Sequence, residues 1–456
     1  MSAVLHRIEP ILPRGVRFTH DQLRAFYGIL EDMQYRRHKG AVLRGYAGCG
    51  KTWLAAFLVE TLKEYGYRVA LAAPTNKAAG VLQGSLAKVC GDSTAVVTLH
   101  SLLGLKAVRH IDGRLEFVQK SDAHISQYDL ILVDECSMVS HRIFDLLLAC
   151  NAYLLFLGDP AQLPPVGYQT ESPTFSHPGF AQFELREVVR QKGDSSILNL
   201  ASDIRNAKKP FSGIFQYADG KSLRLMRHSD FQMSEVTADT RILAWTNKSV
   251  DRYNLTAHNL RFPWGQSPYS AEERLVLQSG LRVGDYSFSN GTEAVIVSVE
   301  NAMHPDWSDV PAWKMRVVMA HGLRYPSPDE AISGVIENSR KEPDALANVE
   351  VTIWIAQNPQ QVERLEEYCF QEAKNAIQKN SCNEAERWAM SGWKLRDDFA
   401  RVKHAYASTV HKSQGSTYHT AVVDLKDLQN PKARGIFNRL LYTAITRPSA
   451  ELVILQ

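Results

Sequence analysis

The run GYAGCGKT, at residues 45–52, has the residue types and the spacing that hold a chain of phosphates. It matches the pattern G-x-x-x-x-G-K-[ST] and stands between an apolar, strand-like run (residues 41–43) and a helix-like segment (residues 53–65). Glycines let backbone N–H groups turn toward phosphates at a helix N-terminus. The pattern predicts that Lys51 reaches the β- and γ-phosphates and that Thr52 holds Mg²⁺. The alternative is a glycine-rich turn in which the Lys-Thr pair is accidental. The predicted nucleotide-binding loop comprises Gly45, Ala47, Gly48, Cys49, Gly50, Lys51 and Thr52.

An acidic pair follows a second apolar run and supplies the groups that a hydrolysis site needs. Asp134 suits Mg²⁺ binding, and Glu135 is placed to accept a proton from an attacking water. The segment GDPAQLPPV (residues 158–166) follows another strand-like run, and Asp159 and Gln162 are predicted to lie beside the γ-phosphate or the water. A solvated acidic pair at a strand end is the other interpretation of Asp134 and Glu135. With the phosphate loop upstream, the sequence favours hydrolysis of ATP or GTP.

Composition argues against several other classes of protein. The chain has 456 residues, of which 45% are hydrophobic and 22% are charged, as in an ordinary globular protein of about three domains. No apolar run approaches the ~20 residues that span a bilayer, and the first residues lack the pattern of a signal peptide. The six cysteines contain no CxxC pair, which argues against a disulfide scaffold or zinc ribbon and favours a reducing location. Because the net charge is only +3, a polyanionic partner must be argued from local sites.

The order of predicted elements indicates an α/β fold with two parallel sheets. Continuous apolar runs, typical of strands buried on both faces, occur at residues 41–43, 68–72, 129–133, 153–157, 241–245, 420–424 and 451–455. Two segments interrupt this order. Asp112-Gly113, with strand-like flanks, predicts a β-hairpin with a type I′ turn. Residues 290–403 hold short β-rich runs followed by helical segments, which predict a small inserted β-barrel with a helical extension.

Read in order, the motifs resemble those of the superfamily 1 helicases. The nucleotide loop resembles motif I, DECSMV resembles motif II and GDPAQLPPV resembles motif III. The other matches are APTNKAA (73–79), TLHSLL (98–103), LREVVRQ (185–191), AWTNKSVDRYN (244–254), STVHKSQGST (408–417) and LLYTAITR (440–447). HKSQGST, LLYTAITR and GDPAQLPPV are similar to superfamily 1B, in its RecD/Dda branch. The short chain and the FSNG element (288–291) are most similar to the Dda-type helicases of tailed phages.

The resemblance implies a fold of two RecA-like parallel-sheet domains with two insertions. The implied ranges are 1–99 and 127–184 for the first RecA-like domain (1A), 100–126 for an inserted β-hairpin (1B), 185–289 and 404–456 for the second RecA-like domain (2A), and 290–403 for an inserted SH3-like barrel with a helical tower (2B). The implied function is an ATP-dependent DNA helicase that moves 5′ to 3′ on single-stranded DNA and unwinds duplex, in phage-type DNA replication and recombination.

The implied cofactors are ATP and Mg²⁺, and the implied partners are single-stranded DNA and forked duplex DNA. A single-strand-binding protein or other replication proteins are further implied partners. Two α/β units in one chain make a monomer the simplest expectation, and the composition predicts no membrane attachment. If the chain is phage-encoded, as the resemblance implies, its location is the cytoplasm of a host cell.

The same resemblance gives roles to individual residues. The implied catalytic residues are Lys51, Glu135, Gln162, Arg190 and Arg447, and the two arginines approach the γ-phosphate from the second α/β unit. Gln22 is implied to read the adenine, while Gln414 and Gly415 face the nucleotide. The implied DNA-binding residues are Pro74, Thr75, Asn76, Thr98, His100, Phe117, Thr246, Asn247, Asn290, Thr409, His411 and Lys412. Phe117 is the candidate wedge at the fork, because a flat aromatic face replaces lost base stacking.

Each of these roles has a simpler alternative. Thr75 and Thr98 are also the residue type that caps a helix after a strand. Phe117 could pack the hairpin onto its domain, and Arg190 could sit in a surface ion pair. Two other functions also fit the motifs, namely an RNA helicase and a P-loop switch that binds a protein partner without unwinding. A structural role for the inserted barrel is compatible with a motor.

Overall fold

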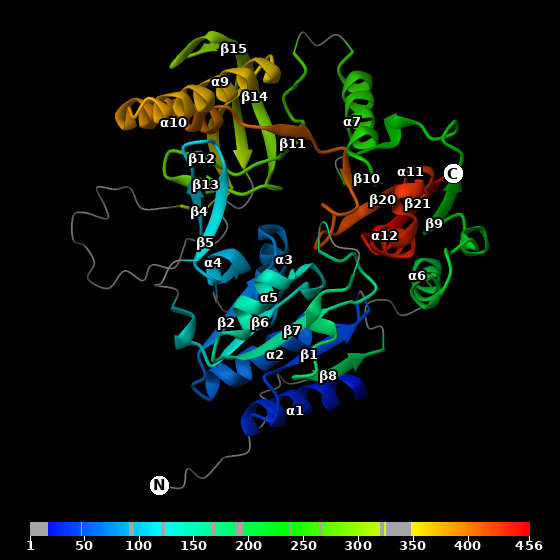
Figure 1. Cartoon of the computed structure of the whole chain (residues 1–456). Coiled ribbons are helices and arrows are strands. Elements are labelled where there is room, and N and C mark those ends of the chain that lie inside the picture. The colour runs from blue at the N-terminus through cyan, green and yellow to red at the C-terminus, as the bar shows by residue number, and fades with distance from the viewer. Residues whose placement is uncertain are drawn as a thin grey trace.

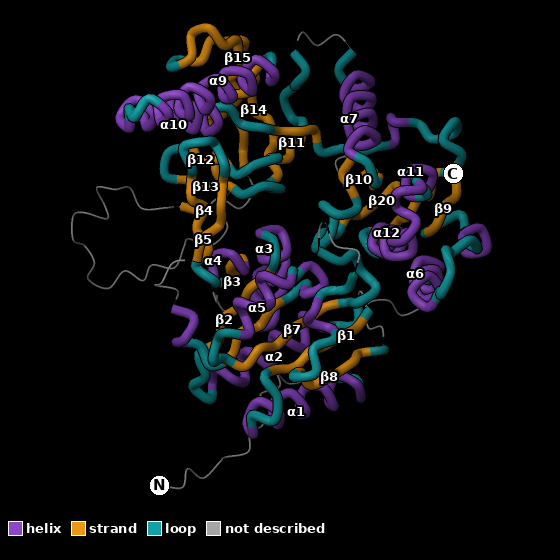
Figure 2. The backbone as a smooth tube through the Cα atoms, in the orientation of Figure 1, coloured by secondary structure: helices purple, strands orange, loops and turns teal. Residues whose placement is uncertain are grey.

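The computed structural model describes residues 17–46, 48–90, 95–119, 124–165, 167, 170–187, 195–237, 239–263, 267–319, 323–324 and 348–456. Figure 1 shows three parts: an α/β unit near the N-terminus, a second α/β unit that holds the C-terminus, and a third, strand-rich unit at the upper left, above the first unit and beside the second. Figure 2 shows that helices and strands alternate in the first two parts. Among the described residues, no helix combines the length and the apolar character needed to cross a membrane.

The first α/β unit is built on a sheet whose described strands all run parallel. Their order is β3 (Val96–Thr98), β2 (Val69–Ala73), β6 (Leu130–Val133), β7 (Tyr153–Gly158), β1 (Gly40–Gly45) and β8 (Phe180–Leu185). The apolar runs predicted as buried strands are therefore confirmed here. Because parallel strands need crossover connections, helices cover both faces of the sheet.

Alternate side chains of these strands feed two separate cores. Leu130 and Leu132 of β6 pack on one face with α1 (His20–Tyr35), α2 (Lys51–Glu64) and α3 (Asn76–Cys90). Ile131 and Val133 pack on the other face. The helices of that second face are α4 (Leu99–Leu102) and α5 (His141–Leu148). This double burial explains why the strands read as continuous apolar runs.

The second α/β unit repeats this design with a parallel sheet in the order β19, β10, β20, β21, β9. These strands are β19 (Ala407–Thr409), β10 (Thr240–Ala244), β20 (Tyr418–Asp424), β21 (Pro448–Leu455) and β9 (Leu223–Met226). One face packs on α6 (Ser196–Asn206), α11 (Leu425–Leu428) and α12 (Phe437–Ile445), and the other on α7 (Asn247–Arg261). Two parallel sheets, as predicted, are therefore present.

The strand-rich unit interrupts the second α/β unit between α7 and β19. A five-stranded sheet has the order β17 (Val349–Ala356), β15 (Trp307–Met319), β14 (Glu293–His304), β11 (Arg274–Leu277), β18 (Val402–His404). A three-stranded sheet joins β12 (Leu281–Val283), β13 (Tyr286–Phe288) and β16 (Leu323–Arg324). Residues of both sheets share one apolar core. The expected boundary at residue 290 is wrong in one respect, because β11, β12 and β13 precede it and yet pair within these sheets.

The predicted helical extension consists of α9 (Pro359–Gln378) and α10 (Cys382–Asp398), which pack against each other. The predicted hairpin is also present, as the antiparallel pair β4 (Leu105–Arg109) and β5 (Leu115–Gln119). Its turn differs from the type I′ turn that was expected. Gly113 has φ +80°, but Asp112 is not among the residues with positive φ. Gly113 N donates to His110 O at 3.0 Å, so the loop is a three-residue connection that ends in a left-handed glycine.

The tip of the hairpin docks on the α9–α10 pair, as Figure 1 shows. Trp393 Nε1 donates to His110 O at 3.1 Å, and Arg396 Nη1 donates to Gly113 O at 3.2 Å. Arg109 forms a two-pronged ion pair with Asp397, at 2.7 and 2.8 Å. Bidentate pairs of this kind fix orientation as well as distance. The hairpin is therefore held at its base by the first α/β unit and at its tip by the inserted unit.

We predict that Gly113→Ala loosens the docked hairpin. A Cβ at this position would lie 2.6 Å from Phe370 Cδ2 of α9, at a φ of +80° that L-residues rarely adopt. Gly66→Ala is the matched control, because Gly66 has the same φ but no atom within 4 Å of its Cβ position. The left-handed backbone costs each variant ~1–2 kcal/mol.

Hydrogen exchange of the hairpin amides measures the local loss of stability around Gly113. We expect exchange over residues 105–119 to speed up by about tenfold in Gly113→Ala, which corresponds to ~1.4 kcal/mol, and to be unchanged in Gly66→Ala. Equal exchange in the two variants would show that the contact with Phe370 does not hold the hairpin.

Candidate functional site

The phosphate loop lies between β1 and the first turn of α2, in the context that its pattern requires. Gly48 and Gly50 adopt φ values of +83° and +82°, which turn the backbone in the way that only glycine does cheaply. Lys51 Nζ donates to Gly45 O and Tyr46 O, each at 2.9 Å. Cys49 is fully buried and fills the space beneath the loop. Ala47, the remaining predicted member, lies outside the described residues.

The acidic pair faces this loop from the end of β6. Thr52 Oγ1 donates to Asp134 Oδ2 at 3.2 Å, which places a hydroxyl and a carboxylate, the hard oxygen ligands that suit Mg²⁺, beside each other. Burial raises the pKa of Asp134. Burial alone would lower the pKa of Lys51, but nearby acidic groups, Cys49, Asp159 and Glu135 foremost, raise it. Lys51 therefore stays charged within reach of the pair.

Glu135 sits in an unusual backbone conformation for its type. Its φ is +50° and its ψ is +43°, in the left-handed region, at the start of a short 3₁₀ turn. Backbone strain of this sort is held in place by the surrounding structure and concentrates at functional sites. Burial and the neighbouring Asp134 raise the pKa of Glu135. The positive charge of Arg447 partly offsets this rise. A carboxylate with a raised pKa is a better proton acceptor, as the predicted role requires.

The predicted adenine reader, Gln22, lies against the back of the phosphate loop and is 2% exposed. Its Oε1 accepts from Thr19 N at 3.0 Å in a capping box, and its Nε2 donates to Cys49 O at 3.2 Å. The side chain therefore supports the loop directly, and both of its polar atoms are engaged by the protein.

A buried carboxylate, Asp159, bridges the two α/β units. Arg205 Nη1 of α6 and Tyr442 OH of α12 both donate to it at 2.5 Å, and Asp159 is 0% exposed. The Arg205 guanidinium also stacks 4.0 Å from the ring centre of Tyr46 in the phosphate loop. Burial and Asp159 raise the pKa of Tyr442, which keeps it a donor. Sequence reasoning missed Arg205, because nothing in the spacing of α6 distinguishes it from a surface arginine.

Polar atoms without partners gather where the two units meet. Among the described residues, no hydrogen bond reaches Gln162 Oε1, Gln414 Oε1, Ser416 Oγ or Ser137 Oγ, although each atom is buried. Gln414 Nε2 donates to Leu163 O at 3.1 Å, which links the second unit to the GDPAQLPPV loop. Buried polar groups are normally satisfied. These orphaned atoms, which come from both units, therefore fit a polar group bound between them.

Arg447 lies at the start of β21 and is 5% exposed. Its guanidinium donates to Thr443 O at 3.0 Å, Ser416 O at 3.3 Å and Thr446 Oγ1 at 3.0 Å, so its charge has no carboxylate partner at ion-pair distance among the described residues. These neutral oxygens fix the orientation of the Arg447 guanidinium. Its positive charge is therefore left to act on Glu135 and on an anion bound in the cleft. The second predicted arginine, Arg190, lies outside the described residues.

The threonines that were predicted to bind DNA all cap a turn or helix. Thr75 Oγ1 accepts from Ala78 N at 3.2 Å, Thr98 Oγ1 from Ser101 N at 3.2 Å, and Thr409 Oγ1 from Lys412 N at 3.3 Å. The alternative interpretation, in which these threonines cap a turn or helix, is thus correct for the oxygen lone pair of each hydroxyl. An accepting hydroxyl keeps its proton, so these three side chains can still donate to a phosphate. Pro74 and Asn76 flank Thr75, and Asn76 is exposed.

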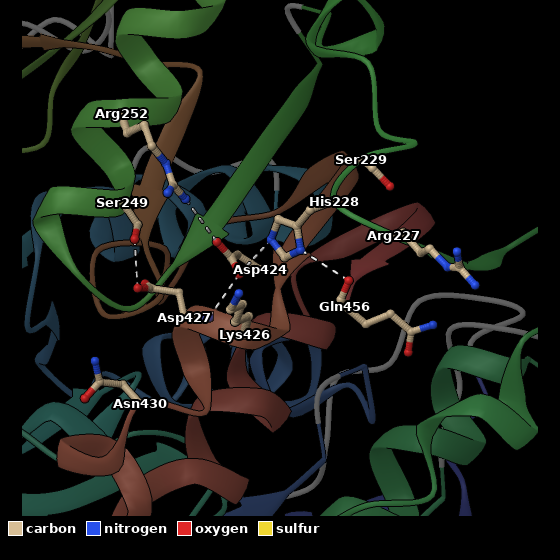
Figure 3. A pocket seen from close by; sticks show the side chains of 10 residues that line it. All are labelled: Arg227, His228, Ser229, Ser249, Arg252, Asp424, Lys426, Asp427, Asn430 and Gln456. Atoms are coloured by element: carbon tan, nitrogen blue, oxygen red, sulfur yellow. Dashed lines mark hydrogen bonds and ion pairs between the residues drawn. The ribbon is translucent and has the colours of Figure 1, made fainter.

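Thr246 differs, because its proton is engaged as well. It accepts from Ser249 N at 3.1 Å and donates to Asp427 Oδ1 at 3.0 Å, while Asp427 Oδ2 accepts from Thr246 N at 2.8 Å. Figure 3 shows Asp427 beside Ser249, which donates to the same carboxylate. Thr246 therefore fixes the start of α7, and the exposed Asn247 beside it is left to meet a ligand.

The remaining predicted DNA contacts lie in four places: the turn after β19, the turn between β13 and β14, α4 and β5. Lys412 is exposed and its Nζ donates to Gln278 Oε1 of the inserted unit at 2.6 Å. Burial lowers the pKa of His411, so it is neutral near pH 7. Asn290 is exposed in the turn between β13 and β14. His100 packs edge-on against Phe117 of the hairpin, with ring centres 5.2 Å apart, and Phe117 is 39% exposed.

One junction that the sequence did not reveal joins all three units. Glu293 of the inserted unit accepts from Lys77 of the first unit and Arg241 of the second, each at 3.1 Å. Burial alone would raise the pKa of Glu293, but these two cations hold it below its usual range. Tyr418 lies under both cations, and its N donates to Arg447 O at 3.0 Å. The junction thus connects Lys77, at the start of α3, with Arg447 through Tyr418.

Comparison with known proteins agrees with this geometry. A family model described as an AAA domain matches residues 18–228, and one described as a UvrD-like helicase C-terminal domain matches residues 404–455. The chain is 27% identical to the ATP-dependent DNA helicase dda of Enterobacteria phage T4 over 94% of this chain and 97% of that one. It is 30% identical to the ATP-dependent RecD2 DNA helicase of Deinococcus radiodurans, over 40% of this chain and 24% of the relative.

The fold is also similar to a solved structure, Bacteroides Pif1 bound to ssDNA, with a TM-score of 0.52. The alignment covers 96% of this chain and 92% of the other, at 18% identity, and so bears on the fold alone. The two matched segments include the residues that line the cleft between the two α/β units, with Lys51, Asp134 and Asp159 from the first unit and Arg205 and Arg447 from the second. The chain therefore resembles the superfamily 1B helicases: it is similar over nearly its whole length to dda, and over part of its length to RecD2.

Proposed function

We propose that this chain is an ATP-dependent DNA helicase that moves 5′ to 3′ on single-stranded DNA and separates duplex strands. The observation that carries the proposal is the cleft between the two α/β units, where Asp159 is bonded from the opposite unit by Arg205 and Tyr442. A nucleotide held there touches both units, so its arrival and loss change how they sit together. The DNA substrate is supported by the names of the relatives, dda and RecD2.

The cleft contains the groups that ATP hydrolysis requires. Lys51 and the loop amides would hold the phosphates, and Thr52 with Asp134 would hold Mg²⁺, which neutralises phosphate charge when bound. Glu135 accepts the proton of the attacking water, and Gln162, with a free Oε1, orients that water. Arg447 presents its charge from the second unit, where charge develops in the transition state. Arg190 is proposed as a second such arginine.

Two DNA grips are proposed, one on each α/β unit. Pro74, Thr75, Asn76, Thr98 and His100 form the grip of the first unit, and Asn247, Thr409, His411 and Lys412 that of the second. Hydroxyls, amides and a single cation hold phosphates without reading sequence. Since the grips stand on the units that the nucleotide draws together, each cycle changes the distance between them. Lys77 lies next to the first grip and pairs with Glu293. Through Tyr418, whose N donates to Arg447 O, this junction is connected to the proposed nucleotide cleft.

The hairpin is proposed as the wedge that parts the duplex. A wedge must resist the strands it separates, and this hairpin is braced at both ends. Arg142 Nη2 donates to Phe117 O at 2.6 Å at its base, and Arg109 pairs with Asp397 at its tip. Phe117 is 39% exposed and stands beside His100, so an aromatic face is open for stacking on a base.

The remaining assignments are proposals that rest on the likeness to the phage relative. The ranges 1A and 1B are proposed as set out from the sequence, while 2B is proposed to span residues 274–403 and 2A residues 185–273 and 404–456. The chain is proposed to act as a monomer in phage-type DNA replication and recombination, in the cytoplasm of the host. A single-strand-binding protein or another replication protein is a proposed partner.

An unwinding assay on forked duplexes tests the function. We expect the protein with ATP and Mg²⁺ to unwind forks with a 5′ single-stranded tail and to leave forks with only a 3′ tail intact. Lys51→Ala should lower the DNA-stimulated ATPase by roughly 100-fold or more, because the phosphates lose their buried cation, while most single-strand binding persists.

The contrary results are distinct. Wild-type hydrolysis in Lys51→Ala would overturn the assignment of the nucleotide site. Stimulation by RNA but not by DNA oligomers would instead favour an RNA helicase. An ATPase that no nucleic acid stimulates would favour a switch protein.

The wedge is tested separately by Phe117→Ala. Because Phe117 is away from the nucleotide cleft, we expect unwinding to fall about tenfold, which corresponds to one lost base stack of ~1–3 kcal/mol. ATPase and translocation on single strands should stay within twofold of the unaltered protein. Leu115→Ala is the matched control, because Leu115 is an exposed apolar residue of the same strand. An equal loss of all three activities in Phe117→Ala would remove the wedge role.

A further inference from the structure

A pocket of about 800 Å³ opens at the carboxyl edge of the second parallel sheet (Figure 3). Asp424 ends β20, while Arg227 and Gln456 follow directly on β9 and β21. Ser249 and Arg252 line it from α7, and Lys426 from α11. The carboxyl ends of parallel strands are where α/β sheets bind their ligands. The nucleotide site described above does not include this pocket, although Ser249 and Arg252 belong to the segment AWTNKSVDRYN (244–254).

The two carboxylates of the pocket are already satisfied by the protein. Asp424, 2% exposed, accepts from Tyr253 OH at 2.7 Å and Asp427 N at 3.0 Å, and His228 Nε2 lies 3.1 Å away. Asp427 accepts from Trp245 N at 2.7 Å, besides its bonds to Thr246 and Ser249. Neither carboxylate therefore needs a cation from outside.

The cations of the pocket are not satisfied to the same extent. Arg227 and Lys426 are both exposed, and no ion pair or side-chain hydrogen bond joins either of them to another described residue. Arg252 lies 3.8 Å from Asp424 and is 63% exposed. The exposed rim thus carries the positive charges, while the two carboxylates of the floor are held by hydrogen bonds within the protein. Such a surface attracts an anion with more than one charge.

The pocket continues from the second DNA grip. Thr246 and Asn247 follow β10, which neighbours β20, and β21 and β9 come next in the sheet. Three strand spacings of ~4.8 Å separate β10 from β9, so the rim extends ~14 Å beyond the grip. Asp427 ties the two places together, because it holds both Thr246 and Ser249.

We propose that this pocket is a phosphate-binding subsite that extends the single-strand track past Asn247. It holds the part of the strand that leaves the motor over the second α/β unit. Arg227 and Lys426 contact backbone phosphates, and no base is read there. The proposal rests on the proposed DNA function and adds a longer footprint on one side of the motor.

Fluorescence anisotropy with labelled oligo-dT tests the subsite. A short oligonucleotide that covers only the two grips is compared with versions extended at the 5′ end or at the 3′ end, over a series of salt concentrations. Arg227→Ala/Lys426→Ala is the test variant. Lys208→Ala/Lys209→Ala is the matched control, because it removes two exposed positive charges of the same unit outside the pocket.

We expect extension at one end only to tighten binding of the unaltered protein and of the control. The test variant should lose that gain, several-fold in affinity, and its salt slope should fall by about 0.7 for each lost phosphate contact. Its affinity for the short oligonucleotide should be unchanged, which also shows that it is folded.

Three outcomes would overturn the subsite. They are equal loss in the test and control variants, equal gain from extension at either end, and no gain from extension at all. The failure of the proposed function looks different, because the unaltered protein would then not bind the short oligonucleotide.

Discussion

A single buried carboxylate, Asp159, holds the two parallel-sheet units in register across the nucleotide cleft. An unpaired carboxylate at 0% exposure would cost several kcal/mol. Here Ala161 N donates from its own loop, and Arg205 and Tyr442 donate from the opposite unit. Because two of its donors belong to the second unit, separating the units exposes the charge to water or leaves it unpaired. The two units are thus tied together across the cleft by bonds to one carboxylate, and buried polar atoms of both units, Gln162 Oε1 and Gln414 Oε1 among them, have no hydrogen-bond partner in the described part of the chain.

The other parts of the molecule transmit what happens at this joint. The junction of Glu293 with Lys77 and Arg241 places one carboxylate where all three units meet. The tip of the hairpin is fixed to the inserted unit, so the hairpin cannot move without α10. A change in the angle between the α/β units would therefore be passed to the proposed DNA grips and to the hairpin through these contacts.

The sequence predicted the parts of the structure that depend on local pattern. The strands buried on both faces read as apolar runs, and the phosphate loop lies between β1 and α2 as its spacing requires. Local pattern could not locate the true edge of the inserted unit, because β11 at Arg274 pairs with β14 and β18, which are distant in the chain. The hairpin turn differed from the prediction because a dipeptide signal does not determine loop length. Only Gly113 takes a positive φ there.

In the candidate site, too, the residues found from the sequence are those set by local spacing, and those missed depend on contacts between distant segments. Lys51, Thr52, Asp134 and Glu135 were found from spacing and lie together. Arg205 was missed, because it acts through a partner in another unit that no linear pattern reveals. The hydroxyl of Thr246 was predicted to meet DNA, yet both its lone pair and its proton are engaged by its own cap and Asp427. Those bonds are set by tertiary packing against α11, which is 180 residues away in the chain and beyond any motif.

The measurement that tests this account most directly is the distance between the two α/β units with and without nucleotide. Spin labels at Glu64 and Lys432, both exposed and on opposite units, would report it in a chain whose exposed Cys382 is replaced by Ser. The account predicts that a non-hydrolysable ATP analogue with Mg²⁺ shortens and narrows the distance distribution, and that Tyr442→Phe, which removes one donor to Asp159, broadens it. A distribution that is the same with and without nucleotide, in both proteins, would contradict it.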